Sequence, residues 1–265
     1  MTSNANDYIL ASTKEPDRVY LQARVWEQET EALFDRLHLP PDGAAVDLGC
    51  GAMGVLGPLA RRMRHVVGVE RDPAMLRAAQ AYLEAENLRN VELREADALS
   101  ADLPEGRFDV AHERFVLPYV APQQLLNRMV TLVKPGGLVI TQEGDNTSWN
   151  FLPINPKWQR FRRLLIDAIN TRGDIDIGQK TFSLLREAGL EHVEARACIL
   201  LLPPGHPYMR MPLSALDALR PVILAGGAAS AEEIDELSHE IERCIADDST
   251  VQLTFTVVQV WGRRP

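Results

Sequence analysis

The sequence predicts an α/β fold in which a mostly parallel sheet ends in an antiparallel strand and carries a helical cap. Three observations support this prediction. Strand and helix patterns alternate from about residue 44 to residue 145, a glycine-rich loop follows the first strand, and a helix-rich stretch separates the last two strands. A chain of 265 residues with 46% hydrophobic content is long enough to bury one core with a small cap.

The first half of the chain alternates short apolar runs with amphipathic segments. Asp72 precedes Pro73 and is typical of a helix N-cap, and Lys134-Pro135-Gly136-Gly137 predicts a turn before the fifth strand. Alternation at this pitch predicts a parallel sheet with helices on both faces and a site at the carboxyl ends of the strands. The expected strands are residues 45–48, 65–70, 91–94, 108–112 and 138–142, and the expected helices are residues 55–64, 73–86 and 123–133.

The second half is richer in helix patterns. Gly189 marks a helix end, and Ser230 with Glu233 three residues later marks a helix start. The expected helices are residues 156–170, 179–188, 213–224 and 231–246, and the expected strands are residues 193–202 and 251–261. We therefore predict a helical lid (1–40), a sheet domain (41–202 and 249–265) and an inserted helical cap (203–248).

Composition limits the partners of the protein. A net charge of -9 argues against a nucleic-acid partner, because such binding depends on Lys and Arg at the phosphates. The three cysteines show no metal-ligand or disulfide spacing, so no metal site is predicted. The polar N-terminus and the lack of a long apolar run predict a cytoplasmic protein without a membrane partner, acting on a small molecule.

The glycine-rich loop lies in the stretch VDLGCGAMG, residues 46–54, where Gly49, Gly51 and Gly54 have GxGxxG spacing. Asp47 would repel the pyrophosphate of a dinucleotide, since a like-charge pair at ~4 Å and an effective dielectric of ~20 costs roughly 4 kcal/mol. The same carboxylate favours a cationic ligand, and S-adenosylmethionine carries a sulfonium and an ammonium without a phosphate. Glu70 lies at the end of the second strand, where a carboxylate can bind the ribose hydroxyls of a ligand. Because several nucleotide-binding folds have such a carboxylate, Glu70 does not distinguish between a dinucleotide and S-adenosylmethionine.

Five stretches together resemble the ordered motifs of the class I S-adenosylmethionine-dependent methyltransferases, in their small-molecule type. They are VDLGCGAMG, VVGVERDPAML, VELREADALSADLP, FDVAHERFVLPYV and LVKPGGLVITQEGD, and they cover about residues 44–145. The resemblance implies a Rossmann-like sheet and S-adenosylmethionine as the cofactor. The glycine-rich loop differs from the commonest loop of the family at one position: Met53 stands where that loop has a third glycine.

The resemblance also implies roles for single residues. Asp47 would hold the methionine ammonium, Glu70 the ribose hydroxyls, and Asp97 with the Ala98 amide the adenine edge. Tyr8 and Tyr20, on the N-terminal segment, are expected to cover the cofactor. The full set of implied cofactor contacts is Tyr8, Tyr20, Asp47, Gly49, Cys50, Gly51, Glu70, Arg71, Asp97, Ala98, His112 and Glu113.

Methyl transfer needs a base only when the nucleophile must lose a proton, and otherwise depends on proximity and alignment. His112, Glu143 and Asp145 lie at the ends of central strands and are the candidate catalytic residues, although a structural hydrogen bond beside the cofactor is the favoured role for His112. Glu113, Asp145 and Asn146 have the outline of a magnesium site, but the rest of that pattern is missing, so no metal is predicted.

Aromatic and soft apolar residues in the loops and inserted helices predict the substrate pocket. They are Phe115, Tyr119, Trp149, Phe151, Tyr208 and Met209, whereas Trp158 is expected in the core. The predicted function is methyl transfer to an O, N or C nucleophile of a small molecule, with bacterial secondary metabolites among the candidates. Two alternatives stay open: an S-adenosylmethionine-binding protein that catalyses a non-methylating rearrangement, and an NAD-type oxidoreductase. The sequence leaves the acceptor undetermined, and both a monomer and a homodimer are compatible with it.

Overall fold

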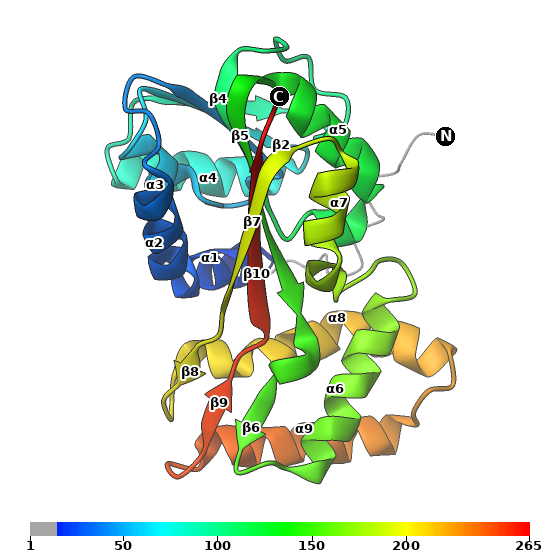
Figure 1. The fold of residues 1–265 in the computed structure, drawn as a ribbon. Coiled ribbons are helices and arrows are strands. Elements are labelled where there is room, and N and C mark those ends of the chain that lie inside the picture. The colour runs from blue at the N-terminus through cyan, green and yellow to red at the C-terminus, as the bar shows by residue number, and fades with distance from the viewer. Residues whose placement is uncertain (1–14) are drawn as a thin grey trace.

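The protein is built on a seven-stranded sheet with the strand order β3-β2-β1-β4-β5-β10-β7 (Figure 1). The computed structural model describes residues 15–265. β10 runs antiparallel to both of its neighbours, while the five strands from β3 to β5 pair in parallel, as the sequence predicts. The strands are β1 (Ala44–Leu48), β2 (His65–Glu70), β3 (Val91–Glu95), β4 (Phe108–Arg114), β5 (Val133–Asp145), β7 (Glu191–Cys198) and β10 (Thr256–Arg263).

Helices cover both faces of the sheet, because parallel neighbours need a crossover between them. One apolar core lies between the sheet and the helices α2 (Glu27–Leu37), α3 (Leu56–Ala60) and α4 (Pro73–Ala85). A second core lies on the opposite face under α5 (Pro122–Leu132) and α7 (Thr181–Glu187). Asp72 caps α4 as expected, since its side chain accepts hydrogen bonds from the Ala74 and Met75 amides.

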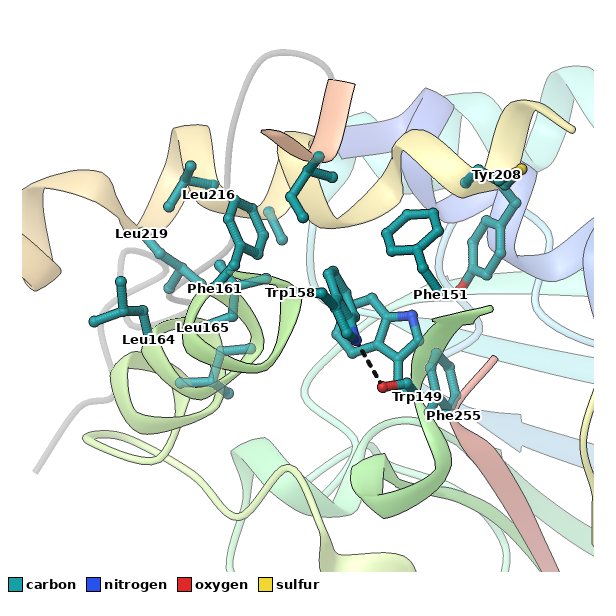
Figure 2. Packing of buried hydrophobic residues seen from close by; sticks show 14 of the residues in the cluster. Trp149, Phe151, Trp158, Phe161, Leu164, Leu165, Tyr208, Leu216, Leu219 and Phe255 are labelled. Carbon is teal, nitrogen blue, oxygen red and sulfur yellow. Dashed lines mark hydrogen bonds between the residues drawn. The ribbon is translucent and has the colours of Figure 1, made fainter. Parts of the chain in front are cut away.

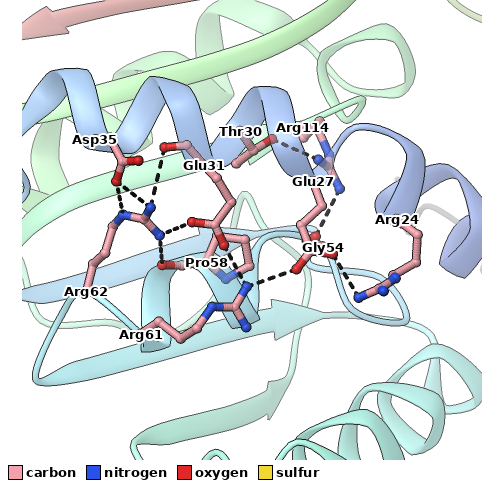
Figure 3. Close-up of polar contacts among 10 residues, drawn as sticks. All are labelled: Arg24, Glu27, Thr30, Glu31, Asp35, Gly54, Pro58, Arg61, Arg62 and Arg114. Carbon is pink, nitrogen blue, oxygen red and sulfur yellow. Dashed lines mark hydrogen bonds and ion pairs between the residues drawn. The ribbon is translucent and has the colours of Figure 1, made fainter.

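Helix α2 is joined to the C-terminal end of α3 by ion pairs (Figure 3). The Arg61 guanidinium contacts Glu27 and Glu31, and Arg62 contacts Glu31 and Asp35. Each pair is partly exposed and contributes little alone, but several charges form one network. The network joins α2 to the segment that follows the glycine-rich loop.

A smaller lobe lies at the far ends of the long strands β5, β7 and β10 (Figure 1). Its three short strands form an antiparallel sheet in the order β6-β9-β8, packed with three helices. The elements are β6 (Asn150–Leu152), β8 (Leu201–Leu202), β9 (Val251–Leu253), α6 (Pro156–Ile169), α8 (Met211–Ala225) and α9 (Ala231–Ala246). Four 3-10 turns complete the described chain: η2 (Leu117–Tyr119), η3 (Asn146–Ser148), η4 (Ile177–Gln179) and η5 (Pro207–Arg210).

The apolar core of this lobe is rich in aromatic side chains (Figure 2). Trp158 is fully buried, as expected, and its indole Nε1 donates to the Trp149 carbonyl at 2.9 Å. Phe151 packs edge-to-face on Trp158 with ring centroids 5.0 Å apart. In this core, α6 packs with the inserted helices α8 and α9. The boundaries that the sequence predicts for the sheet domain and the inserted cap stay a prediction.

Three local predictions differ from the structure. The strands expected at 193–202 and 251–261 are each divided in two, because Leu200 and Thr254 exchange hydrogen bonds where the chain leaves the large sheet. The helix expected at 55–64 is limited to Leu56–Ala60. The expected turn at residues 134–137 lies inside β5 as a register shift between β4 and β5. Within residues 15–265, no helix has the length and apolarity needed to span a membrane.

Candidate functional site

The glycine-rich loop follows β1 and is shaped by backbone conformations that favour glycine. The Gly49 and Cys50 amides both donate to the Val69 carbonyl, at 2.8 and 3.0 Å. Gly54 has φ +47°, and a Cβ atom there would lie 2.5 Å from the Cys50 carbonyl oxygen. Since that oxygen belongs to the loop backbone, only glycine fits this position without moving the loop.

Asp47 lies buried beneath this loop, with 2% of its surface exposed. Its Oδ1 accepts from His112 Nδ1 at 2.8 Å and its Oδ2 accepts from the Val55 amide at 3.3 Å. The aspartate thus fixes the start of α3 and the imidazole of His112. Its predicted contact with the methionine ammonium stays a prediction, because Asp47 is not among the residues that line the cavity above the loop.

His112 is a fully buried, neutral imidazole. Burial lowers its pKa below the usual value, against the opposing effect of the Asp47 carboxylate. Gln142 Nε2 lies 2.8 Å from His112 Nε2, and Gln142 Oε1 accepts from Thr30 and Gln259, so the amide donates to the imidazole. Both ring nitrogens are therefore engaged, which favours a structural role for His112 over its predicted role as a base.

A cavity of about 480 Å³ opens above the glycine-rich loop. Its volume falls within the range of roughly 300–1,000 Å³ typical of small-molecule sites. Helix α1 (Glu15–Val25) covers it with Val19, Gln22 and Ala23. The predicted cofactor residues that line it are Gly49, Cys50, Gly51, Glu70, Arg71, Asp97 and Ala98.

Glu70 ends β2 at the edge of this cavity and organises its backbone. Its Oε2 accepts from the Gly51 amide at 3.0 Å, and its Oε1 accepts from the Arg71 and Asp72 amides at 2.8 and 2.9 Å. A carboxylate has about four acceptor sites, so three bonds leave capacity for a ribose hydroxyl. Burial raises the pKa of Glu70 above its usual value, while the three amide bonds lower it.

Arg71 and Asp97 flank the same cavity. The Arg71 Nη1 and Asp97 Oδ2 atoms lie 3.8 Å apart, and both side chains are partly exposed. Asp97 Oδ1 accepts from the Leu99 amide at 2.8 Å, which fixes the carboxylate at the end of β3. The predicted adenine contacts therefore lie together on one wall.

Arg114 also lines the cavity and was not among the predicted site residues. Its guanidinium donates to the Gly54 carbonyl at 2.9 Å and to Thr30 Oγ1 at 3.1 Å (Figure 3). Burial lowers the pKa of Arg114 to about 10, which still leaves it cationic at neutral pH. A guanidinium has five N–H donors, so donors remain for the carboxylate of a bound amino acid. Arg114 lies in the stretch FDVAHERFVLPYV, but nothing in that stretch assigns it a contact with the cofactor.

A second cavity, of about 80 Å³, adjoins the first, and Gln22, Phe115 and Tyr119 line both. Phe115 has φ +61°, a conformation that is strained for a bulky residue and that is often found at functional sites. The remaining walls are mostly apolar and come from α6, α8 and the ends of β5 and β10. They include Trp149, Leu165, Ile169, Met211, Ala215 and Phe255.

Two buried carboxyl groups lie beside the small cavity. Glu143 lines it, and its Oε1 accepts from the Val116 and Leu117 amides at 3.0 and 2.9 Å. Glu113 Oε2 accepts from the same Val116 amide at 3.2 Å. Asp145 is the third carboxylate that was predicted for this region. Unlike Glu143, it lines neither cavity, and its side chain accepts hydrogen bonds from Thr147 and Gln179.

The other predicted residues divide into three groups. Tyr8 lies outside the described residues, and Tyr20 is 42% exposed, with its ring edge on Tyr82. Phe115, Tyr119 and Trp149 line the small cavity. The third group is buried in the aromatic core and lines neither cavity; it consists of Phe151, Tyr208 and Met209. Substrate binding by these three residues stays a prediction.

Comparison with known proteins identifies the family. Residues 45–137, which hold the glycine-rich loop, Glu70 and Asp97, match a family model described as a methyltransferase domain. The chain belongs to the class I S-adenosylmethionine-dependent methyltransferases. Its cofactor is S-adenosylmethionine, and the NAD-type alternative is set aside.

Relatives of this methyltransferase include a ubiquinone biosynthesis O-methyltransferase from Cereibacter sphaeroides, 28% identical over 65% of this chain and 71% of the relative. An uncharacterized 37.1 kDa protein of transposon TN4556 from Streptomyces fradiae is 34% identical, but the match spans 46% of this chain and 35% of that protein. The solved geranyl diphosphate C-methyltransferase from Streptomyces coelicolor A3(2) shares the fold, with a TM-score of 0.54 and 19% identity over 96% of this chain and 85% of that one.

Proposed function

We propose that this methyltransferase methylates an O, N or C nucleophile of a small, largely apolar molecule. The observation that carries the proposal is the pair of adjoining cavities, which share Gln22, Phe115 and Tyr119. A cofactor in the larger cavity and an acceptor in the smaller one would meet at this shared wall. Holding both reactants in one geometry can lower the barrier of a reaction by about 7–11 kcal/mol.

The residues around the larger cavity fit S-adenosylmethionine. Glu70 would accept from the ribose hydroxyls, the Asp97 and Ala98 segment would contact the adenine, and Arg114 would pair with the methionine carboxylate. The glycines with positive φ carry no side chains, so the loop backbone stays accessible to the methionine part of the cofactor. A side chain at Gly51 would also press on Val19 of α1. When bound, S-adenosylmethionine supplies a methyl group already activated by its sulfonium.

The residues around the smaller cavity fit an apolar acceptor. Its walls are aromatic and aliphatic, and the polar side chains among them are Arg18, Gln22, Glu143 and Asn146. The name of one similar protein places it in ubiquinone biosynthesis, and another methylates geranyl diphosphate, whose geranyl chain is apolar while its diphosphate is charged. A secondary metabolite of this character, methylated in the cytoplasm by a monomer or homodimer without nucleic acid, is the acceptor that we propose.

The test is S-adenosylhomocysteine release by the purified protein with a catechol, geranyl diphosphate and a primary aromatic amine as probes. We expect release with at least one probe, and loss of that release in Ile169→Trp, which fills the small cavity away from the cofactor. Calorimetry should show unchanged S-adenosylmethionine affinity in the same variant. Cofactor binding without release for any probe would favour the non-methylating alternative.

A further inference from the structure

Glu113 and Glu143 lie on neighbouring strands at the carboxyl end of the sheet. β4 and β5 pair in parallel with Glu113 opposite Thr141, so Glu113 and Glu143 point to the same face. Both side chains have 0% exposure. Two acidic groups buried this completely need a partner or a proton.

Few protein donors reach this pair. The Val116 and Leu117 amides serve one oxygen of each carboxyl group. The other oxygens, Glu113 Oε1 and Glu143 Oε2, receive no N–H or O–H donor from any residue in the described part of the chain. Both carboxyl groups accept from the same Val116 amide, so they lie close together, and a proton shared between them would relieve their mutual repulsion.

Burial sets the protonation of the pair. Desolvation and the neighbouring Glu143 raise the pKa of Glu113 well above its usual range. Desolvation raises the pKa of Glu143 to about 7, while Glu113 and the backbone amides lower it. The nearby cations are Arg114 on β4, which is engaged by Gly54 and Thr30, and Arg18 on α1, which lines the small cavity. Burial and the repulsion between the two carboxylates therefore favour a proton on the pair.

We propose that Glu113 and Glu143 form a proton-sharing pair that accepts a hydrogen bond from a neutral O–H or N–H acceptor in the small cavity and takes its proton. This inference rests on the proposed function. Glu143 is the member that lines the apolar cavity, so its oxygen is the polar group that such an acceptor would meet.

The chemistry balances without another reactant. The acceptor oxygen or nitrogen forms its bond to the methyl carbon, and the carbon–sulfur electron pair stays on sulfur. The acceptor proton moves to the Glu143 carboxylate, so one positive and one negative charge disappear together. Glu113, the other member of the pair, lies against the same Val116 amide, holds Glu143 in place and acts as a positioning residue.

The first experiment needs no acceptor. Infrared spectra of the protein with carbon-13 glutamate should show a protonated, buried carboxyl at pH 7 that is missing in Glu113→Gln. A second carboxyl should titrate near neutral pH in the wild type and not in Glu143→Gln. Glu194→Gln, an exposed glutamate on β7, is the matched control and should change neither signal. Absence of a protonated carboxyl at pH 7 would overturn the proposal.

The second experiment compares methyl transfer to phenol and to thiophenol, measured as S-adenosylhomocysteine release. Glu143→Gln should lower transfer to phenol by about 10²–10⁴-fold, the usual contribution of a general base, and should lower transfer to thiophenol much less, because the thiolate has no proton to lose. Equal losses with both probes would overturn the proposal. Failure of the proposed function is distinct, since it would appear as S-adenosylmethionine binding without release for any probe, while the infrared signals of the carboxyl pair stay as described.

Discussion

Substitution of Gly54 by alanine tests whether the glycine-rich loop is shaped for its ligand by backbone geometry. A Cβ atom at residue 54 would lie 2.5 Å from the Cys50 carbonyl oxygen and 2.6 Å from Asp47 Oδ2. The Cys50 oxygen is backbone and Asp47 is held by His112, so neither can move aside freely. The loop itself must shift to accept the new atom.

The magnitude follows from two contributions. A left-handed conformation costs an alanine about 1–2 kcal/mol relative to glycine. Overpacking in a rigid environment adds about 1–3 kcal/mol. Gly54→Ala should therefore lower the free energy of unfolding by about 2–5 kcal/mol.

Gly106→Ala is the matched control. Gly106 has φ +61°, close to the value of +47° at Gly54, but its Cβ would have no atom within 4 Å. Only the backbone contribution of about 1–2 kcal/mol applies there. Urea denaturation gives both stabilities, and calorimetric titration with S-adenosylmethionine gives both affinities. We expect weakened binding in Gly54→Ala and unchanged binding in Gly106→Ala. Equal stability losses in the two variants, or full affinity in Gly54→Ala, would refute this reasoning.

Three further predictions follow from the buried groups. Asp47→Ala should lower the free energy of unfolding in urea denaturation by about 1–3 kcal/mol for each of two buried donors, His112 Nδ1 and the Val55 amide, that lose their acceptor; a fully stable variant would contradict this. Trp158→Phe should cost about 1–3 kcal/mol by the same assay, through the unsatisfied Trp149 carbonyl and a smaller ring, with S-adenosylmethionine affinity retained. The pKa of Glu143, raised to about 7 in the folded state from about 4.5, means that its contribution to stability is present in acid and is lost as the pH rises from about 4.5 to 7. The loss amounts to about 3 kcal/mol. Relative to Glu143→Gln, the wild type should therefore become less stable as the pH rises over that interval. Parallel curves of unfolding free energy against pH for the two proteins would argue against the raised pKa of Glu143.

The lowered pKa of His112 acts in the opposite sense. A histidine that is neutral when folded loses stability as the pH falls below its unfolded value of about 6.5. Both wild type and Glu143→Gln carry this contribution, so the difference between their curves isolates the carboxyl group.

Much of the fold could be predicted because local patterns determine it. The strand at residues 65–70 has the predicted bounds, since a short apolar run ends in a polar residue. The helix at 231–246 also has its predicted bounds, since Ser230 accepts from the Glu233 amide as an N-cap. Where the chain changes sheets at Leu200 and Thr254, the prediction failed, because that corner depends on hydrogen bonds between residues distant in sequence.

The site was predicted in part for the same reason. Gly49, Glu70 and Asp97 follow strand ends, and the parallel order of the strands brings them to one cavity. The partners of Asp47 and the pairing of Glu113 with Glu143 depend on the register between neighbouring strands, which the sequence does not state. Arg114 was missed because its partners, Gly54 and Thr30, lie far from it in the chain.

The most direct test of the account is calorimetric titration of the wild type and Glu70→Ala with S-adenosylmethionine, S-adenosylhomocysteine and NAD. We expect the wild type to bind both adenosyl compounds and not NAD. Glu70→Ala should bind both adenosyl compounds more weakly, because the ribose acceptor and the loop contact at Gly51 are lost. Binding of NAD alone, or unchanged affinity in Glu70→Ala, would contradict the placement of S-adenosylmethionine in the large cavity.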